Sequence, residues 1–142
     1  MSPTRLTDAD YRRLLELRGG LRRFLKWSAD LAADSGVTSS QHQLLLVARA
    51  HEIPKGPTVG DIATELLTRH HSVVELVNRC ENAGLVVREP DDDDQRMVRV
   101  RLTAQGRDIL DRLTELHIAE LNRLAPSIAP MWAGLDPEDP EA

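Results

Sequence analysis

Apolar side chains recur with helical spacing along most of the chain. This recurrence predicts five helices, over residues 8–34, 39–51, 59–66 and 69–83 and from residue 104 onward. Pro126 and Pro130 are expected to break the last helix, because proline lacks the amide hydrogen and its ring clashes with the preceding turn. A short apolar piece at residues 131–135 and an acidic tail at residues 136–142 are expected to follow.

The predicted helix boundaries carry local capping signals. Three threonines are predicted to form capping boxes, in which the side chain three residues later accepts a hydrogen bond from the threonine amide. A fourth threonine is a simple N-cap candidate. Gly36 and Gly84 suit the left-handed position after a helix, and each is followed by an apolar residue. The threonine signals are Thr7 with Asp10, Thr38 with Gln41, Thr58 with Asp61, and Thr103.

The hydrophobic period changes from 3.6 to 2 after Gly84. Residues 85–89 form a short β-rich run, and residues 97–102 alternate apolar and basic side chains, as a half-buried strand does. Pro90 and four consecutive aspartates lie between the two runs. The pattern predicts a β-hairpin with a polar, acidic loop.

A short helix, a tight turn at Leu67-Thr68, a longer helix and then a hairpin make up a winged helix-turn-helix. The predicted fold class is therefore mainly α, with a small β-hairpin wing. A helix fits the DNA major groove, where its N-terminal side chains reach base edges, and a hairpin arginine is favoured in the neighbouring minor groove. The candidate DNA contacts on the longer helix are Arg69, His70, His71 and Ser72, with Asn78 and Arg79 further along.

The chain also resembles the MarR family of bacterial transcription regulators, over roughly residues 37–121. The matching segments are Thr58-Val59-x-Asp61-Ile62-Ala63, Ser72-Val73-Val74-x-Leu76-Val77-x-Arg79, Ala83-Gly84-Leu85-Val86-x-Arg88, and Asp94-Gln95-Arg96 followed by Leu102-Thr103 and Gly106. The resemblance implies that Arg96 enters the minor groove and that Asp94 helps to hold the wing. We add Arg88 and Arg99 to the candidate DNA contacts.

The resemblance further implies a single MarR-type domain over residues 1–142. In it, a DNA-binding lobe at residues 38–103 is flanked by long N- and C-terminal dimerisation helices at residues 8–34 and 104–135. The expected protein is a homodimeric, ligand-responsive repressor on a palindromic operator whose half-sites lie about 10 base pairs apart. Its small-molecule effector is expected between the first, second and last helices, with Trp27 and His42 as candidate contacts.

The net charge of −5 is spread unevenly and does not by itself favour a nucleic-acid partner. Residues 55–106, which contain the predicted helix-turn-helix, carry seven basic and nine acidic side chains. The aspartates at 91–94 are expected to be repelled by DNA phosphates unless they pair with Arg88, Arg96 or Arg99. An alternative therefore stays open: a winged-helix protein–protein adaptor that does not bind DNA.

Composition and motifs limit which other classes of protein this chain could belong to. A single cysteine, Cys80, excludes an internal disulfide and multi-cysteine metal motifs, and we expect it to be a small core residue. Five histidines, among them His42 and His117, leave a zinc-responsive regulator as a second alternative, although no metal-binding spacing is present. No catalytic motif, cofactor loop, signal peptide or membrane segment is visible, so we expect a cytoplasmic protein that is neither an enzyme nor membrane-bound.

Overall fold

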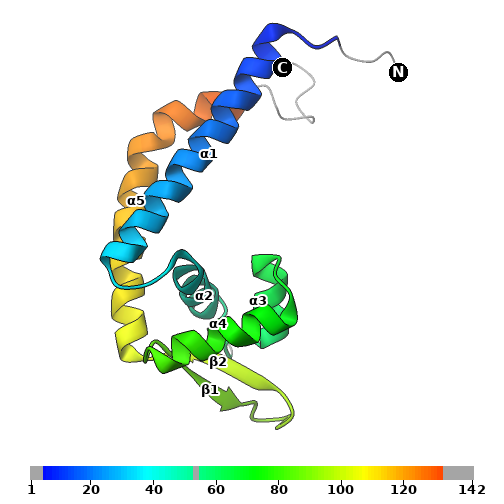
Figure 1. Cartoon of the computed structure of the whole chain (residues 1–142), viewed down its shortest axis with the longest axis vertical. Helices are drawn as coiled ribbons and strands as arrows, with labels where there is room; N and C mark the ends of the chain where they lie inside the picture. Colours follow the sequence, from blue (N-terminus) through cyan, green and yellow to red (C-terminus); the bar gives the residue numbers. More distant parts are fainter. Residues whose placement is uncertain (1–4, 53–54, 133–142) are drawn as a thin grey trace. The chain divides into compact units, whose positions relative to one another are not determined.

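The computed structural model describes residues 5–52 and 55–132 of the chain. These residues form a mainly α winged helix-turn-helix, in which five helices accompany a two-stranded antiparallel wing (Figure 1). The elements are α1 Asp8–Asp34, α2 Ser39–Ala50, α3 Val59–Leu66, α4 His70–Asn82, β1 Val86–Pro90, β2 Val98–Leu102 and α5 Ala104–Trp132. The fold class predicted from the sequence is confirmed.

The capping signals in the sequence are confirmed. Thr38 with Gln41 and Thr58 with Asp61 form complete capping boxes at α2 and α3. The Thr103 hydroxyl accepts a hydrogen bond from the Gly106 amide at 3.0 Å, at the start of α5. Each of these bonds satisfies an amide that the first helical turn leaves without an intrahelical acceptor.

Both predicted glycine stops adopt the left-handed conformation. Gly36 has φ 86° after α1, and Gly84 has φ 76° after α4. The Leu85 amide, one residue beyond Gly84, donates to the Cys80 carbonyl at 2.9 Å, which is the Schellman arrangement. The stop therefore turns the chain directly from α4 into the wing.

The predicted break at Pro126 and Pro130 is wrong, because α5 continues through both prolines to Trp132. Each proline removes one amide donor and leaves the carbonyl four residues earlier without its helical partner. Both prolines are exposed and are one turn apart, so the freed carbonyls lie on a side of the helix that water reaches. No described helix, α5 included, is long and apolar enough to cross a membrane. The acidic tail at 136–142 lies outside the described residues.

The described chain divides into two compact units. The central unit comprises residues 31–115, and the helical unit comprises residues 5–30 and 116–132. A continuous apolar core fills the central unit, with contributions from both strands and from each helix in it. Its largest fully buried side chains include Leu44, Leu45, Ile62, Val73, Val77, Leu110 and Leu113.

The wing is attached to α3 as well as to α4. β1 and β2 pair in an antiparallel register that places Val86 opposite Leu102 and Pro90 opposite Val98. On the other edge of β2, the Val100 amide donates to the Pro57 carbonyl at 2.9 Å, and Thr58 forms an isolated bridge with Arg99. The residues that enter α3 therefore run beside β2 and hold the wing at its base.

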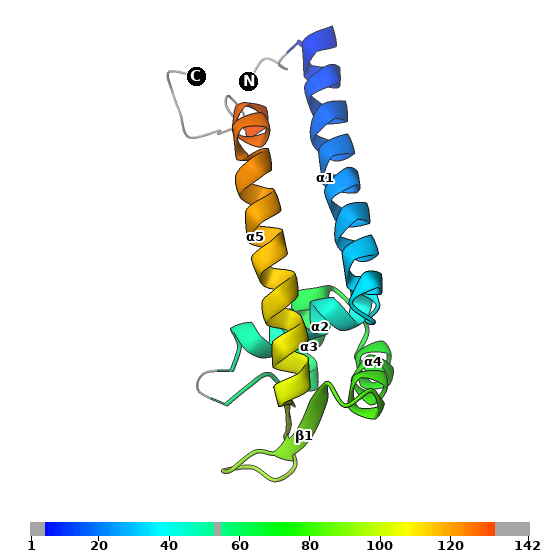
Figure 2. The same cartoon turned by 90° about the vertical axis from the view of Figure 1, so that its left-hand side faces the viewer.

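In the helical unit, α1 lies beside α5, as Figures 1 and 2 both show. The Trp27 ring meets the His117 ring edge-on, with centroids 4.9 Å apart, and Phe24 stacks on Trp27 at 5.8 Å. Ser28 Oγ and His117 Nε2 are hydrogen-bonded at 2.6 Å. This cluster supplies both apolar burial and a polar link between the two helices.

We predict that Gly106→Ala strongly destabilises the central unit. A Cβ at Gly106 would lie 2.1 Å from the carbonyl oxygen of Leu85, a buried backbone group that has little room to move. We expect the free energy of unfolding to fall by about 1–3 kcal/mol, the usual cost of overpacking a well-packed site. Gly60→Ala in the first turn of α3 is the matched control, because its Cβ would meet only the Thr58 hydroxyl at 3.7 Å.

Chemical denaturation measures both variants. We expect Gly60→Ala to leave stability unchanged or to raise it by up to about 1 kcal/mol, since alanine favours a helix over glycine. Equal stability of the Gly106→Ala variant and the wild type would contradict the close packing of α5 on the wing.

Candidate nucleic-acid interface

The turn between α3 and α4 determines where α4 begins. Leu67 ends α3 in the left-handed conformation, with φ 52°, and the Thr68 amide donates to the Ala63 carbonyl at 3.0 Å. Arg69 is the N-cap residue of α4, and its side chain makes no capping hydrogen bond. The Arg69 side chain is therefore not held by the helix that it precedes.

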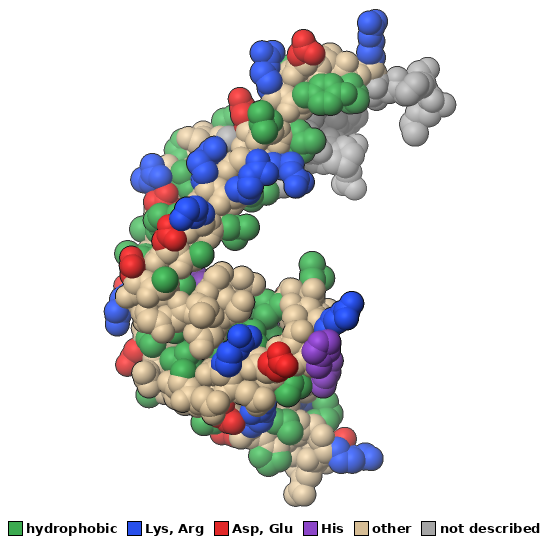
Figure 3. Space-filling view, viewed as in Figure 1, with side chains coloured by type: hydrophobic (Ala, Val, Ile, Leu, Met, Phe, Trp, Pro, Cys, Tyr) green, Lys and Arg blue, Asp and Glu red, His purple; other side chains and the backbone are tan. Residues whose placement is uncertain are grey.

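α4 buries one face and exposes the other. Val73, Val77 and Cys80 are fully buried in the core of the central unit. Arg69, His70 and His71 are exposed and Ser72 is half-buried. Figure 3 shows histidine and basic side chains along the edge of this unit that α4 and the wing present. The sequence-predicted residues at the start of α4 thus share one accessible surface.

Arg88 and Asn78 bind each other. Arg88 Nη2 donates to Asn78 Oδ1 at 2.6 Å, while Arg88 Nη1 donates to Glu81 Oε1 at 2.9 Å. The Arg88 side chain is 27% exposed. These bonds tie β1 to α4, so in this structure Arg88 acts as a brace between wing and helix. DNA contact by Arg88 or Asn78 stays a prediction.

The tip of the wing presents Arg96. Asp94 accepts hydrogen bonds on Oδ1 from the Arg96 amide at 3.1 Å and from Arg96 Nε at 3.2 Å. The Arg96 side chain is nevertheless 92% exposed, and a pair between exposed groups contributes little to stability. Asp94 therefore shapes the turn that carries Arg96 and leaves the guanidinium open to solvent.

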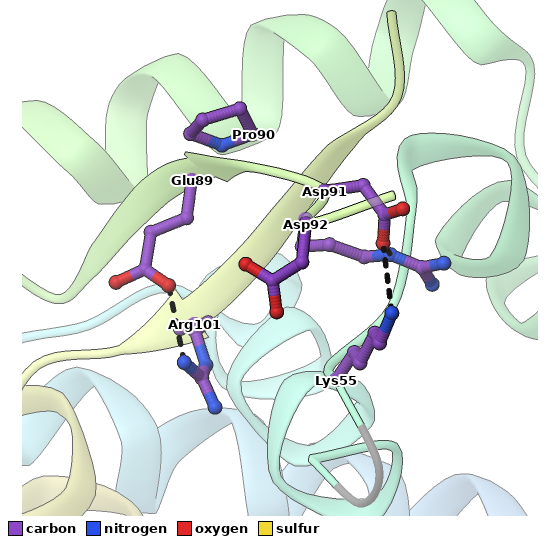
Figure 4. A pocket seen from close by; sticks show the side chains of 7 residues that line it. Lys55, Glu89, Pro90, Asp91, Asp92 and Arg101 are labelled. Carbon is purple, nitrogen blue, oxygen red and sulfur yellow. Dashed lines mark hydrogen bonds and ion pairs between the residues drawn. The ribbon is translucent and has the colours of Figure 1, made fainter. Parts of the chain in front are cut away.

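The base of the wing is held by a buried carboxylate (Figure 4). Asp91 is 6% exposed and accepts a hydrogen bond from Arg99 Nε at 3.0 Å. Arg99 Nη1 donates to the Gly56 carbonyl at 3.1 Å, and Lys55 Nζ lies 2.7 Å from Asp93 and 3.9 Å from Asp91. The loop before α3, β2 and the acidic wing loop are thereby joined.

These contacts shift the pKa values of Asp91 and Lys55. Hydrogen bonds donated by the backbone amide of Asp94, and after it by Arg99 and the amide of Asp93, lower the pKa of Asp91. The hydrogen bond to Asp93 raises the pKa of Lys55. A carboxyl whose pKa is lowered by folding stabilises the folded state above its unfolded pKa, and that contribution is lost as the pH falls through the lower value. The wing base is therefore an acid-sensitive element.

Most of the acidic wing is neutralised from within. Of the three arginines that could pair with the wing aspartates, Arg96 and Arg99 do so, whereas Arg88 pairs with Glu81. Lys55 was not anticipated, because its contact with Asp93 spans 38 residues and leaves no local sequence signal.

The arginines of the central unit differ in whether they contact a carboxylate of another segment. Arg88, Arg99, Arg101 and Arg107 each contact a carboxylate of another segment. Among the described residues, Arg69 and Arg79 on α4 have no carboxylate partner, and Arg96 contacts only Asp94, two residues before it. Arg112 on α5 is exposed and likewise has no carboxylate partner among the described residues. Cations available to an external anion therefore lie at both ends of α4, at the wing tip and on α5.

The two candidate effector residues lie in different units. Trp27 lines a cavity of about 310 Å³ between α1 and α5 of the helical unit, beside Phe24, Leu124 and Ile128. His42 is 8% exposed within the central unit. Their joint participation in one effector site stays a prediction.

Cys80 and the histidines provide no metal site among the described residues. No group of three histidine, cysteine or acidic side chains is placed to hold an ion there. Burial raises the pKa of the Cys80 thiol to about 11. At neutral pH this thiol is protonated and unreactive, as a structural core cysteine is.

The chain is similar in sequence to known transcription regulators. Residues 35–97 match the MarR family model. The chain is 31% identical over 86 residues to the HTH-type transcriptional regulator YkoM of Bacillus subtilis, an alignment that covers 60% of this chain and 51% of YkoM. The chain thus spans about half the length of the curated relatives it matches.

Solved structures that share the fold include a DNA complex and a ligand complex. A single-residue mutant of S. aureus MepR bound to an oligodeoxyribonucleotide superposes with a TM-score of 0.65 at 19% identity, over 93% of this chain and 100% of MepR. CouR from Rhodococcus jostii RHA1 bound to p-coumaroyl-CoA superposes with a TM-score of 0.68 at 24% identity, over 86% of each chain. At these identities the likeness establishes the fold.

We predict that Cys80 resists thiol reagents in the folded protein. A buried, protonated thiol offers neither access nor thiolate, so at pH 8 labelling is expected only after denaturant is added. Mass spectrometry after brief exposure to iodoacetamide measures the labelled fraction. Rapid stoichiometric labelling without denaturant would contradict a core role.

Proposed function

We propose that this chain, whose residues 35–97 match the MarR family model, is a transcription regulator that binds double-stranded DNA sequence-specifically. The observation that carries the proposal is the separation of charge described above. Three of the cations without a partner from another segment, Arg69, Arg79 and Arg96, lie along α4 and at the wing tip, where a winged helix-turn-helix meets DNA.

In this proposal α4 enters the major groove by its N-terminal end. Arg69, His70, His71 and Ser72 reach base edges there, since the first turn of a recognition helix lies deepest in the groove. Arg96 enters the adjacent minor groove, whose negative potential favours arginine. The paired residues Arg88 and Arg99 hold the wing in position for this contact.

We further propose that the protein acts as a homodimer. The outer faces of the helical unit expose large apolar side chains, including Leu14 at 56%, Leu21 at 52% and Ile118 at 54%. Large apolar side chains exposed on two helices are typical of an association surface in a soluble protein. A two-fold dimer presents two α4 helices to successive major grooves and favours a palindromic operator.

Response to a small-molecule effector and a repressor role complete the proposal. The apolar cavity beside Trp27 supports an effector site, and the structure of CouR, which shares the fold, contains p-coumaroyl-CoA. The protein represses transcription if its operator overlaps a promoter. The effector releases the protein from DNA if it favours a conformation in which the spacing of the two α4 helices does not match the operator.

Selection of bound sequences from a random duplex pool tests DNA recognition. We expect enrichment of a palindrome whose half-sites lie about 10 base pairs apart. Enrichment of no sequence by a folded wild-type protein, with and without added zinc, would contradict the proposal and favour a protein–protein adaptor.

On the selected duplex, we predict that Arg96→Ala weakens binding by about 1–3 kcal/mol, because a minor-groove arginine is lost. Its unfolding midpoint is expected to match the wild type, since the side chain is almost fully exposed. Gln95→Ala, at the neighbouring exposed position, is the control and should bind normally. Arg99→Ala should instead lower the unfolding midpoint. Unchanged affinity of the Arg96→Ala variant would place the wing away from DNA.

We predict that the double substitution Leu14→Glu, Leu21→Glu produces monomers. Four charges introduced into a two-fold interface cannot be buried without partners. Sedimentation velocity should give about twice the 15.9 kDa chain mass for the wild type and the chain mass itself for the variant. Arg12→Glu, a charge change at an already polar position of α1, should remain dimeric. A monomeric wild type would contradict the dimer proposal.

A further inference from the structure

A cleft with both polar and apolar lining residues opens between the N-terminal half of α2, the turn between α3 and α4, and one side of α4. It has a volume of about 160 Å³ and lies wholly within the central unit. The lining residues are Ser40, Gln43, Leu66, Thr68, Ser72, Leu76 and Arg79. Ser72, Leu76 and Arg79 share one face of α4 because they are spaced by four and three residues.

The cleft contains a cation and hydroxyl groups that the fold does not use. Arg79 has no carboxylate partner among the described residues, although Glu75 lies one turn before it. Thr68 and Gln43 are already occupied, since Thr68 Oγ1 donates to the Leu66 carbonyl and Gln43 Nε2 donates to Ser39 Oγ. Ser40 and Ser72 make no side-chain hydrogen bond with another described residue. The unused donors thus face one small space.

This set of donors suits a phosphodiester. A guanidinium binds two phosphate oxygens in a planar fork, and serine hydroxyls donate to a third. The volume of about 160 Å³ is enough for one phosphate group.

The position of Arg79 along α4 favours the DNA backbone as the source of that phosphate. Arg79 follows Arg69 by ten residues, which corresponds to about 15 Å of helix rise. The major groove is about 8.5 Å deep, so a helix that enters by its first turn and tilts away from the groove floor carries a residue this far back beyond the base edges. The groove wall at that height is the phosphate backbone.

We propose that this cleft, the α2–α4 cleft, seats one phosphate of the operator backbone. Arg79 supplies the charge, and Ser40 and Ser72 supply the hydroxyl donors. The proposal rests on the proposed DNA-binding function and assigns Arg79 to positioning on the backbone, as distinct from base recognition. It also makes Ser40 in α2 a DNA contact, which the sequence pattern did not single out.

Salt dependence of binding tests the phosphate seat. We expect Arg79→Gln to weaken binding about ten-fold, equally on the selected duplex and on an unrelated duplex. It should also reduce the slope of log affinity against log salt concentration by about 1. Arg79→Lys should restore the wild-type slope. Ser40→Ala should weaken binding and leave the slope at its wild-type value. Arg112→Gln is the matched control, because Arg112 is exposed on α5 outside the cleft.

Circular dichroism melts confirm that each variant is folded. If Arg79→Gln behaves like Arg112→Gln while the wild type binds normally, the phosphate seat is overturned and the proposed function stands. A change of preference at one base position with an unaltered slope would also overturn it, by assigning Arg79 to a base. If the wild type binds neither duplex, the proposed function fails and the seat fails with it.

Discussion

The pairing of Asp91 with Arg99 determines how this small winged unit presents its charges. It joins the acidic wing loop to β2, and through Lys55 and the Gly56 carbonyl it joins both to the chain that enters α3. A buried carboxylate without these donors would be costly, so the wing is held in the one arrangement that satisfies it. The orientation of the wing is therefore an electrostatic constraint as well as a consequence of strand pairing.

The same pairing explains how an acidic protein presents a face suited to DNA. The negative net charge of the chain disfavours binding to a polyanion such as DNA. Net charge does not, however, distinguish charged groups that are paired within the protein from those that are unpaired. Within the central unit, internal carboxylates neutralise the arginines that brace the wing, whereas Arg69, Arg79 and Arg96 remain accessible. The local surface, and not the total charge, carries the argument for nucleic-acid binding.

Local signals in the sequence predicted the helices, the capping boxes, the glycine stops and the hairpin, because each depends on residues only a few positions apart. The break at Pro126 was predicted wrongly, since proline disfavours a helix without forbidding one on an exposed face. Contacts between distant segments left no such signal. The contact of Lys55 with Asp93 and the cleft that joins Ser40 to Arg79 became visible only when folding brought these residues together.

Arginine-selective labelling with phenylglyoxal, read by mass spectrometry with and without the selected duplex, tests the separation of charge most directly. The account predicts that DNA protects Arg69, Arg79 and Arg96, that Arg99 is slow to react in both states, and that Arg12 and Arg22 on α1 react equally in both. Protection confined to α1, with Arg69 and Arg96 fully reactive in the complex, would contradict it.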